Sequence, residues 1–296
     1  MQPTALAASQ DSEHPAVALD PVDLARYPLH RPDSPAWRDA VRTARAQLDA
    51  DGCAVLPGFV RASWRDRLRT EGEAVAPRAH HETAVVNVYN TDPDPSLPDD
   101  HPARLAMERG NAFVARDRIP DSALVHRLYP LPAFRAFLAA CVGVPELHEL
   151  ADPLAGLCLN VVAGGRSHPW HFDTNEIAIS LLTRAPEAGG EFEYCPDIRS
   201  AEAENTAAVA DVLHGRGGDR VRRLVLRAGD LQLFRGRYSL HRVTEVRGST
   251  ARHTAIFSYS ARPGVVGSAV RTRQLFGRTL PEHGGSRSVR VDGLMD

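Results

Sequence analysis

The spacing of apolar residues divides the chain near residue 150 into a helical part and a strand-rich part. Before that point, apolar residues recur three or four positions apart, as on a helix with one buried face. Helices are predicted at residues 34–50, about 62–76 and 132–142. Ser34 is a suitable N-cap for the first helix, and a proline begins the third. A short strand is predicted at 53–56, and the Asn-, Asp- and Pro-rich residues 85–100 are typical of a loop.

After residue 150 the apolar runs are short, and most are separated by glycine-bearing turns, which is typical of β-strands. Strands are predicted at 157–162, 177–182, 191–194, 224–226, 231–234, 243–246 and 254–259, with a short helix within 201–213. Many short strands of this kind indicate a β-sandwich or barrel. We therefore predict an arm at 1–20, a helical region at 21–150 packed on the core, and a mainly β catalytic core at 151–296.

Composition excludes some classes of function. The chain has 296 residues and a formal net charge of −2, so it has no bulk attraction to nucleic acid or to an anionic membrane. No apolar run approaches the roughly 20 residues that span a bilayer. Residues 1–20 lack the basic start and apolar core of a secretion signal, which favours a cytoplasmic protein. The four cysteines form no paired short spacing and are expected to be buried free thiols.

A split set of metal-binding residue types is the strongest chemical signal in the chain. His171 and Asp173 are two positions apart, so on a strand both side chains would point to one face. We expect them at the start of a strand, with His241 at the start of another. Two histidines and a carboxylate on one face of an ion leave positions open, as in non-haem Fe(II) oxygenases. The alternative is a chance His-x-Asp pair and a hydrogen-bonded core histidine.

Arg252 is expected to begin a strand that runs antiparallel to the strand of His241, and Thr254 shares its face. An arginine that enters an apolar strand needs an anionic partner if it is buried. All 35 basic residues are arginines, so a fixed cation for a carboxylate must be an arginine or a metal. Arginine binds carboxylates bidentately. Arg252 is therefore predicted to bind the far carboxylate of a dicarboxylate cosubstrate, the alternative being a salt bridge at the edge of the sheet.

These segments together resemble the Fe(II)/2-oxoglutarate-dependent oxygenase superfamily. The resemblance covers roughly residues 150–285 and rests on HPWHFDTNE at 168–176, GGEFEY at 189–194, GDLQLFRGRYSLHRVTEV at 229–246 and RHTAIFSYSARPG at 252–264. More narrowly, the chain is similar to the branch that contains free-amino-acid hydroxylases and amino-acid radical halogenases. The resemblance implies a double-stranded β-helix (a cupin-like jelly roll) with N-terminal helical decoration.

The resemblance also implies a set of site residues. Iron(II) would be held by His171, Asp173 and His241, and 2-oxoglutarate would meet Arg252 and Thr254, with dioxygen as the oxidant. Residues near an amino-acid-like substrate are expected to be His168, Asn160, Ser258, Phe276 and Arg109. The related halogenases carry a small residue, typically glycine, at the position of Asp173, which leaves room for chloride. The carboxylate here favours hydroxylation of an aliphatic C–H.

Other functions remain open at this point. The same scaffold can carry out desaturation, cyclisation or halogenation. A non-redox cupin-like isomerase or hydrolase could use the same ligands with zinc and would not need Arg252. A silent binding protein on this fold is a third class, which the joint presence of the ligands and the arginine disfavours. The expected partner is a small molecule, and the sequence leaves the oligomeric state open, with a homodimer as one option.

Overall fold

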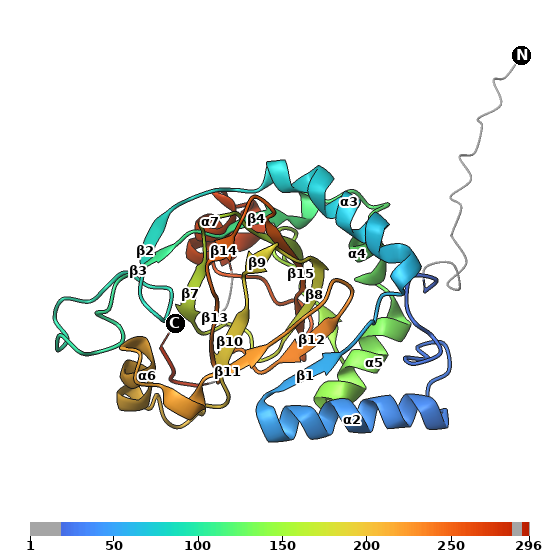
Figure 1. Cartoon of the computed structure of the whole chain (residues 1–296), viewed down its shortest axis with the longest axis horizontal. Coiled ribbons are helices and arrows are strands. Elements are labelled where there is room, and N and C mark those ends of the chain that lie inside the picture. The colour runs from blue at the N-terminus through green and yellow to red at the C-terminus, as the bar shows by residue number, and fades with distance from the viewer. Residues whose placement is uncertain (1–18, 286–291, 296) are drawn as a thin grey trace, which may run out of the picture.

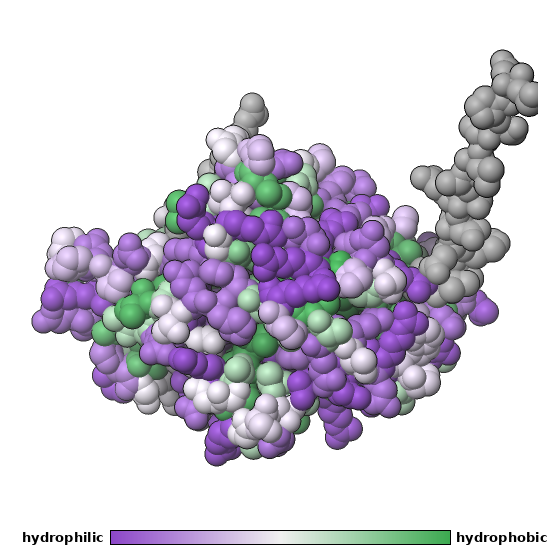
Figure 2. Space-filling view, turned by 90° about the horizontal axis from the view of Figure 1, so that it is seen from above, coloured by the Kyte–Doolittle hydropathy of each residue, from purple (hydrophilic) through white to green (hydrophobic). Residues whose placement is uncertain are grey.

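The computed structural model describes residues 19–285 and 292–295, so nearly all of the arm predicted at 1–20 lies outside the described residues. Its α-helices are α2 (Pro35–Asp51), α3 (Arg65–Val75), α4 (Leu124–Leu128), α5 (Pro132–Val142), α6 (Thr206–Leu213) and α7 (Ala269–Phe276) (Figure 1). None of the helices in the described ranges is both long and apolar enough to cross a membrane. On the face seen in Figure 2, hydrophilic side chains dominate and apolar ones are scattered.

Two antiparallel sheets form the centre of the molecule. The larger has the strand order β1 (Cys53–Leu56), β12 (Leu231–Phe234), β8 (Ala178–Arg184), β15 (Arg252–Phe257), β6 (Leu157–Val162) and β4 (Ala112–Ala115). The smaller has the order β11 (Arg222–Leu224), β10 (Phe192–Cys195), β13 (Leu240–Val243) and β7 (His168–His171). Three short pairs flank them: β2 (Ala84–Val86) with β3 (Met107–Arg109), β5 (His148–Glu149) with β16 (Tyr259–Ser260), and β9 (Ala188–Gly189) with β14 (Val246–Arg247).

The strands of the larger sheet have one apolar face and one mixed face, because side chains alternate along a strand. Leu159 of β6 and Leu181 of β8 belong to the main hydrophobic core, together with side chains of α2 and α5. The helices that supply these side chains lie beside the larger sheet in Figure 1. Their neighbours along the same strands, Asn160 and Ser180, point to the opposite face of the sheet and line a cavity. The sheet therefore separates the core from the site.

Several element boundaries follow from local signals and match the prediction. Ser34 caps α2 by accepting a hydrogen bond from the backbone N–H of Trp37 at 3.3 Å. Helix α5 spans the predicted residues and ends at Gly143, whose φ of 81° lies in the left-handed region that glycine adopts without strain. The cysteines are also as expected, because all four are buried and unpaired.

Other predictions were wrong in detail. The strand predicted at 224–226 is instead β11, which ends at Leu224, and Val225 is 84% exposed. At this edge of the smaller sheet the arginines of β11 take polar partners, such as Glu193 at 3.0 Å from Arg223, so apolar residues are not required. The strand predicted at 243–246 is split, with β13 ending at Val243 and β14 beginning at Val246. Helix α7 was not predicted.

Candidate metal and active site

Strand pairing brings the two candidate histidine ligands together. Strand β13 pairs with β7 in a register that places His241 directly opposite His171, with ring centroids 4.0 Å apart. The Nδ1 atom of His171 lies 2.8 Å from the carbonyl oxygen of Pro169, and that of His241 lies 3.0 Å from the carbonyl of Ser239. A carbonyl only accepts hydrogen bonds, so both Nδ1 atoms carry the proton. Each Nε2 lone pair is then available to a metal.

Asp173 completes the cluster as predicted, but it does not lie on a strand. His171 is the last residue of β7 rather than the start of a strand, and Asp173 lies in the turn beyond it. His241 is the second residue of β13, at the start of a strand as predicted. The Asp173 carboxylate oxygens are 3.8 Å from Nε2 of His171 and 3.5 Å from Nε2 of His241. One ligand atom from each of the three residues falls within 4.8 Å of the others.

The protonation states of these residues fit a metal site. Burial, followed by repulsion from His168, holds the pKa of His171 well below its usual value, so this imidazole is neutral. Burial alone would raise the pKa of Asp173, but the neighbouring His241 and His171 outweigh it and lower the pKa to about 2. Neutral imidazole and ionised carboxylate are the forms that bind a metal ion. Two histidines and one carboxylate that face a cavity suit a divalent transition metal with open coordination positions.

Arg252 is a buried cation that the described part of the chain leaves without a carboxylate partner. It begins β15 and is 4% exposed, and burial lowers the pKa of its guanidinium to about 10, so it stays charged at neutral pH. Its Nη1 donates to the Thr254 hydroxyl, two residues along the same face. Strand β15 pairs with β6 and β8 in the larger sheet, so Arg252 and His241 lie on different sheets. A buried cation without an anionic partner is costly, and an anionic ligand would remove that cost.

A cavity of about 710 Å³ lies between the two sheets and joins these groups. Its lining includes all three ligand candidates, Arg252 and Thr254, and four of the five predicted substrate residues: His168, Asn160, Ser258 and Phe276. The ring of His168 stacks on that of His171 at 3.8 Å, and Asn160 accepts a hydrogen bond from Asn111 at 3.0 Å. The volume is typical of small-molecule sites.

Arg109 is the one predicted substrate residue that does not line the cavity. It is 2% exposed, and its Nη2 donates to the backbone carbonyl of Gln274 in α7 at 2.9 Å. Its Nε and Nη1 atoms are buried without a hydrogen-bond partner in the described structure. Burial lowers the pKa of Arg109. Burial is also the main cause of the low pKa of His168, and the charge of Arg109 contributes to it. Arg109 therefore lies against α7 and outside the cavity lining, but its charge acts on His168, which does line the cavity.

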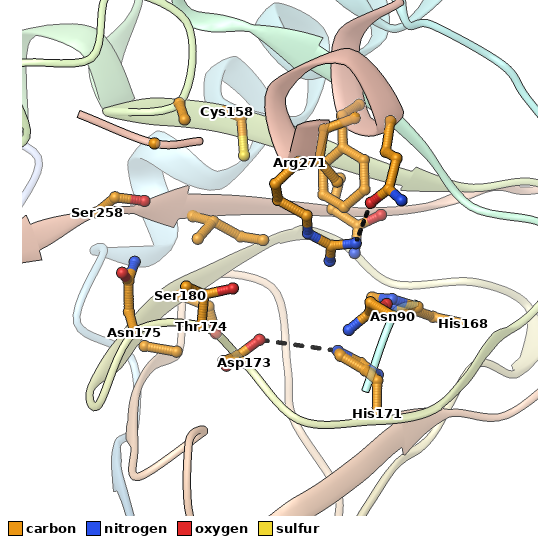
Figure 3. Close-up of a pocket in the computed structure, with 18 of the residues that line it drawn as sticks. Asn90, Cys158, His168, His171, Asp173, Thr174, Asn175, Ser180, Ser258 and Arg271 are labelled. Carbon is orange, nitrogen blue, oxygen red and sulfur yellow. Dashed lines mark hydrogen bonds and ion pairs between the residues drawn. The ribbon is translucent and has the colours of Figure 1, made fainter. Parts of the chain in front are cut away.

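Helix α7 brings residues to the cavity that sequence reasoning missed. Figure 3 shows Arg271 extending from this helix into the pocket on the side of Asp173 and His171. Its Nη1 donates to the Gln274 side chain at 3.2 Å, and its charge contributes to lowering the pKa of Asp173. Gln232 and Ser180 were also missed, although polar residues at alternate positions of apolar strands are a signal that could have found them.

Comparisons with known proteins place the fold. The crystal structure of the epimerase SnoN in complex with Fe3+, alpha ketoglutarate and nogalamycin RO has a TM-score of 0.51 and 16% identity, covering 86% of this chain and 95% of that one. A 2OG-Fe(II) oxygenase family oxidoreductase from Burkholderia pseudomallei has a TM-score of 0.48 and 17% identity, covering 76% and 92%. AviO1 from Streptomyces viridochromogenes Tue57 has a TM-score of 0.49 and 19% identity, covering 76% and 95%. None of the curated proteins matches the chain.

The likeness to SnoN shows that the two chains share a fold. The family is shown by a separate comparison. The model of the HalD family, described as Halogenase D, matches residues 37–270. The match spans most of the chain, and the chain therefore belongs to the halogenase D family.

Proposed function

We propose that this protein is an Fe(II)- and 2-oxoglutarate-dependent oxygenase that hydroxylates an aliphatic C–H bond of a small, amino-acid-like molecule. The observation that carries the proposal is a pairing of two features across one cavity. One is a cluster of two histidines and an aspartate whose ligand atoms lie within 4.8 Å of one another. The other is Arg252, buried and charged with no carboxylate partner among the described residues.

Each residue has a defined task in this proposal. His171, Asp173 and His241 hold the iron, and the carbonyls of Pro169 and Ser239 fix the orientation of the two imidazoles. Arg252 and Thr254 bind the far carboxylate of 2-oxoglutarate, which directs its other end towards the iron. When bound, the iron and 2-oxoglutarate supply the oxidising chemistry with dioxygen. The walls of the cavity hold the target C–H close to the metal and limit access of water.

The substrate is proposed to be a free amino acid or a derivative. His168, Asn160, Ser258 and Phe276 line the cavity that also contains the ligand cluster, and we assign them to substrate contact. Arg109 is assigned to the same task because two of its buried nitrogen atoms lack a partner. To reach a substrate, its guanidinium needs α7 to shift, since the helix backbone now holds its Nη2 atom.

Hydroxylation is preferred over halogenation because of Asp173. Membership of the halogenase D family raises halogenation as the second candidate. The Asp173 carboxylate, however, faces both Nε2 atoms and takes the position that a halide would need. A negative ligand at this position disfavours a second anion beside it. Oxygen insertion is therefore the proposed outcome.

The proposal is tested by a turnover experiment. The protein is incubated in air with Fe(II), 2-oxoglutarate, chloride and each of the standard L-amino acids in turn. Succinate and the mass of each amino acid are then measured. We expect one or a few amino acids to stimulate succinate formation and to gain one oxygen atom. Succinate formation together with a chlorinated product would favour halogenation. An amino acid that is converted in the absence of 2-oxoglutarate would favour a non-redox metal enzyme.

An Asp173→Gly variant tests the role of the carboxylate directly. Removing one of three protein ligands should abolish hydroxylation, because the remaining two histidines hold the metal weakly and without fixed geometry. The oxygenated product is measured by mass spectrometry at saturating Fe(II), with and without chloride. Hydroxylation at the wild-type rate would mean that Asp173 is not a ligand.

We infer that the two sheets form the double-stranded β-helix, with residues 21–150 packed on a core at 151–296. The antiparallel pairing of all the strands in both sheets supports this arrangement. We also propose a cytoplasmic enzyme whose partner is a small molecule rather than a nucleic acid or a membrane.

A further inference from the structure

The turn at residues 235–239, which joins β12 to β13, contacts two of the three proposed ligands. The backbone carbonyl of Gly236 accepts a hydrogen bond from the backbone N–H of Asp173 at 3.0 Å. The carbonyl of Ser239 lies 3.0 Å from Nδ1 of His241. One turn therefore orients a histidine on its own strand and the carboxylate that follows β7. No local sequence signal links the turn to Asp173, since 63 positions separate Gly236 from it (236 − 173).

Gly236 leaves the space that the Asp173 carboxylate occupies. A Cβ atom built on Gly236 would lie 2.7 Å from Cγ and 2.9 Å from Cβ of Asp173, and closer still to Oδ2. Oδ2 is the oxygen that lies 3.5 Å from Nε2 of His241. Gly236 is absent from the residues with positive φ, so its backbone conformation does not demand glycine. The space for the carboxylate does demand it.

The turn has little freedom to move away from a larger side chain. The backbone N–H of Arg235 donates to the carbonyl of Gly52 at 2.9 Å, and the Arg235 side chain pairs with Asp49 at 2.8 Å. The carbonyl of Arg237 accepts from Nε of the fully buried Arg199 at 2.7 Å. These bonds hold both sides of Gly236. A side chain at this position would therefore displace the carboxylate rather than the turn.

We infer that Gly236 is a positioning residue for Asp173, and that it sets the orientation in which the carboxylate faces the metal centre. The inference rests on the proposed metal site and goes beyond it, because it assigns a role in metal affinity to a residue that offers no ligand atom. The complementarity is specific to a pair: Gly236 matters to the site only while residue 173 carries a carboxylate.

Cobalt(II) is a suitable probe, because its visible absorption reports both binding and the geometry of the ligands. It is titrated into the apoprotein without oxygen, for the wild type, Gly236→Ala, Asp173→Gly and the double variant. We expect the Gly236→Ala change to weaken cobalt binding by about 10–100-fold, the range seen when a group that orients a ligand is lost. In the Asp173→Gly background the same change should alter affinity by less than about threefold, because the two effects are coupled.

Four outcomes are separable. A wild type that binds neither cobalt(II) nor Fe(II) overturns the proposed metal site itself. The inference alone is overturned if the wild type binds cobalt and the Gly236→Ala variant binds it with the same affinity and the same spectrum. An equal loss of affinity in both backgrounds also overturns it, because the change then acts without the carboxylate. Loss in the presence of Asp173 only is the result that we expect.

Thermal unfolding of the four apoproteins covers the case in which Asp173→Gly binds cobalt too weakly to measure, or in which Gly236→Ala folds poorly. The Gly236→Ala change should lower Tm in the wild-type background and leave it nearly unchanged in the Asp173→Gly background. An equal drop in both backgrounds contradicts the inference. Gly284→Ala is the matched control, since a Cβ at Gly284 meets nothing within 4 Å, and it should change neither Tm nor affinity.

Discussion

Two neighbouring residues of β15 are both buried and ionisable, but they face opposite sides of the larger sheet. Arg252 points into the cavity and His253 lies beneath α3, where its Nδ1 atom would be 3.3 Å from a Cβ built on Gly72. Burial lowers the pKa of Arg252 to about 10, so it remains a cation at neutral pH. Burial, reinforced by Arg184, lowers the pKa of His253 to about 4, so it is neutral.

His253 and Arg252 show how a buried residue that only stabilises the fold differs from a buried residue that is expected to bind a ligand. A buried histidine can lose its proton and with it most of the cost of desolvation, whereas an arginine cannot. On β15, the cost of burying a cation falls on the face of the sheet that lines the cavity. A buried cation that has no anionic partner in its own chain is expected to receive one from a ligand.

The largest expected effect is that of Arg252→Met, which removes the charge and keeps a stem of similar length. We expect the Kd for 2-oxoglutarate to rise by at least about 30-fold, since losing one partner of a buried charge pair costs about 2–5 kcal/mol. The apoprotein should meanwhile become more stable, because a buried unpaired cation is replaced by an apolar group. Anaerobic 2-oxoglutarate titration and thermal unfolding measure the two effects.

Arg252→Lys is the control for this prediction, because it retains the charge without the bidentate fork. Its 2-oxoglutarate affinity should lie between those of the wild type and Arg252→Met. If Arg252→Met lowers apoprotein stability instead, the arginine serves the fold, and the contrast between Arg252 and His253 disappears.

A smaller effect is expected from the opposite face, through the pH dependence of stability. The folded-state pKa of His253 is about 4, below the usual value of 6.5, so the unfolded chain binds the proton more readily. Stability is therefore lost as pH falls from about 6.5 to 4, by up to about 3 kcal/mol. The charged groups near this ring are Arg184 and Glu73, which pair with each other at 3.3 Å.

His253→Leu should remove this part of the pH dependence, and it should not affect 2-oxoglutarate binding. Urea unfolding at several pH values between 4 and 7 measures the change. His81→Leu, at an exposed histidine, is the control and should leave the profile unchanged. An identical pH profile in wild type and His253→Leu would show that His253 does not resist protonation.

The smallest effect is expected for Thr254→Val, which keeps the shape of the side chain and removes the hydroxyl that accepts from Arg252. A single hydrogen bond contributes about 1 kcal/mol net, so the Kd for 2-oxoglutarate should rise about fivefold. Anaerobic titration of 2-oxoglutarate into the variant and into the wild type gives this ratio. A loss as large as that of Arg252→Met would mean that Thr254, rather than the guanidinium, dominates recognition.

Local signals in the sequence predicted much of the fold. Helix α5 and strands β6 and β12 have the predicted boundaries, because capping residues, glycines and apolar runs mark them. The triad and Arg252 could also be proposed from the sequence, since their residue types are unusual in apolar strands. Strand pairing then brings them together through the register that sets His241 opposite His171.

Features that depend on three-dimensional contacts were not predictable. Asp173 lies beyond the end of β7, where strand periodicity no longer determines direction. A glycine in a turn, such as Gly236, gives no indication in the sequence that the Asp173 carboxylate packs against it. Arg109 donates a hydrogen bond to the backbone carbonyl of Gln274. Every residue has a backbone carbonyl, so this contact cannot be predicted from the residue types. Helix α7, which delivers Arg271 to the pocket, has only 8 residues, and its buried residues are Thr272 and Phe276, so it offers no repeated apolar positions that would predict a helix.

The most direct test of the central claim is a titration of 2-oxoglutarate into the anaerobic Fe(II)-loaded protein, followed by visible absorption. We expect a weak charge-transfer band that saturates in the wild type. The band should require a much higher concentration of 2-oxoglutarate in Arg252→Met and should be lost in His241→Ala. Absence of the band in wild-type protein that has been shown to bind Fe(II) would contradict the account.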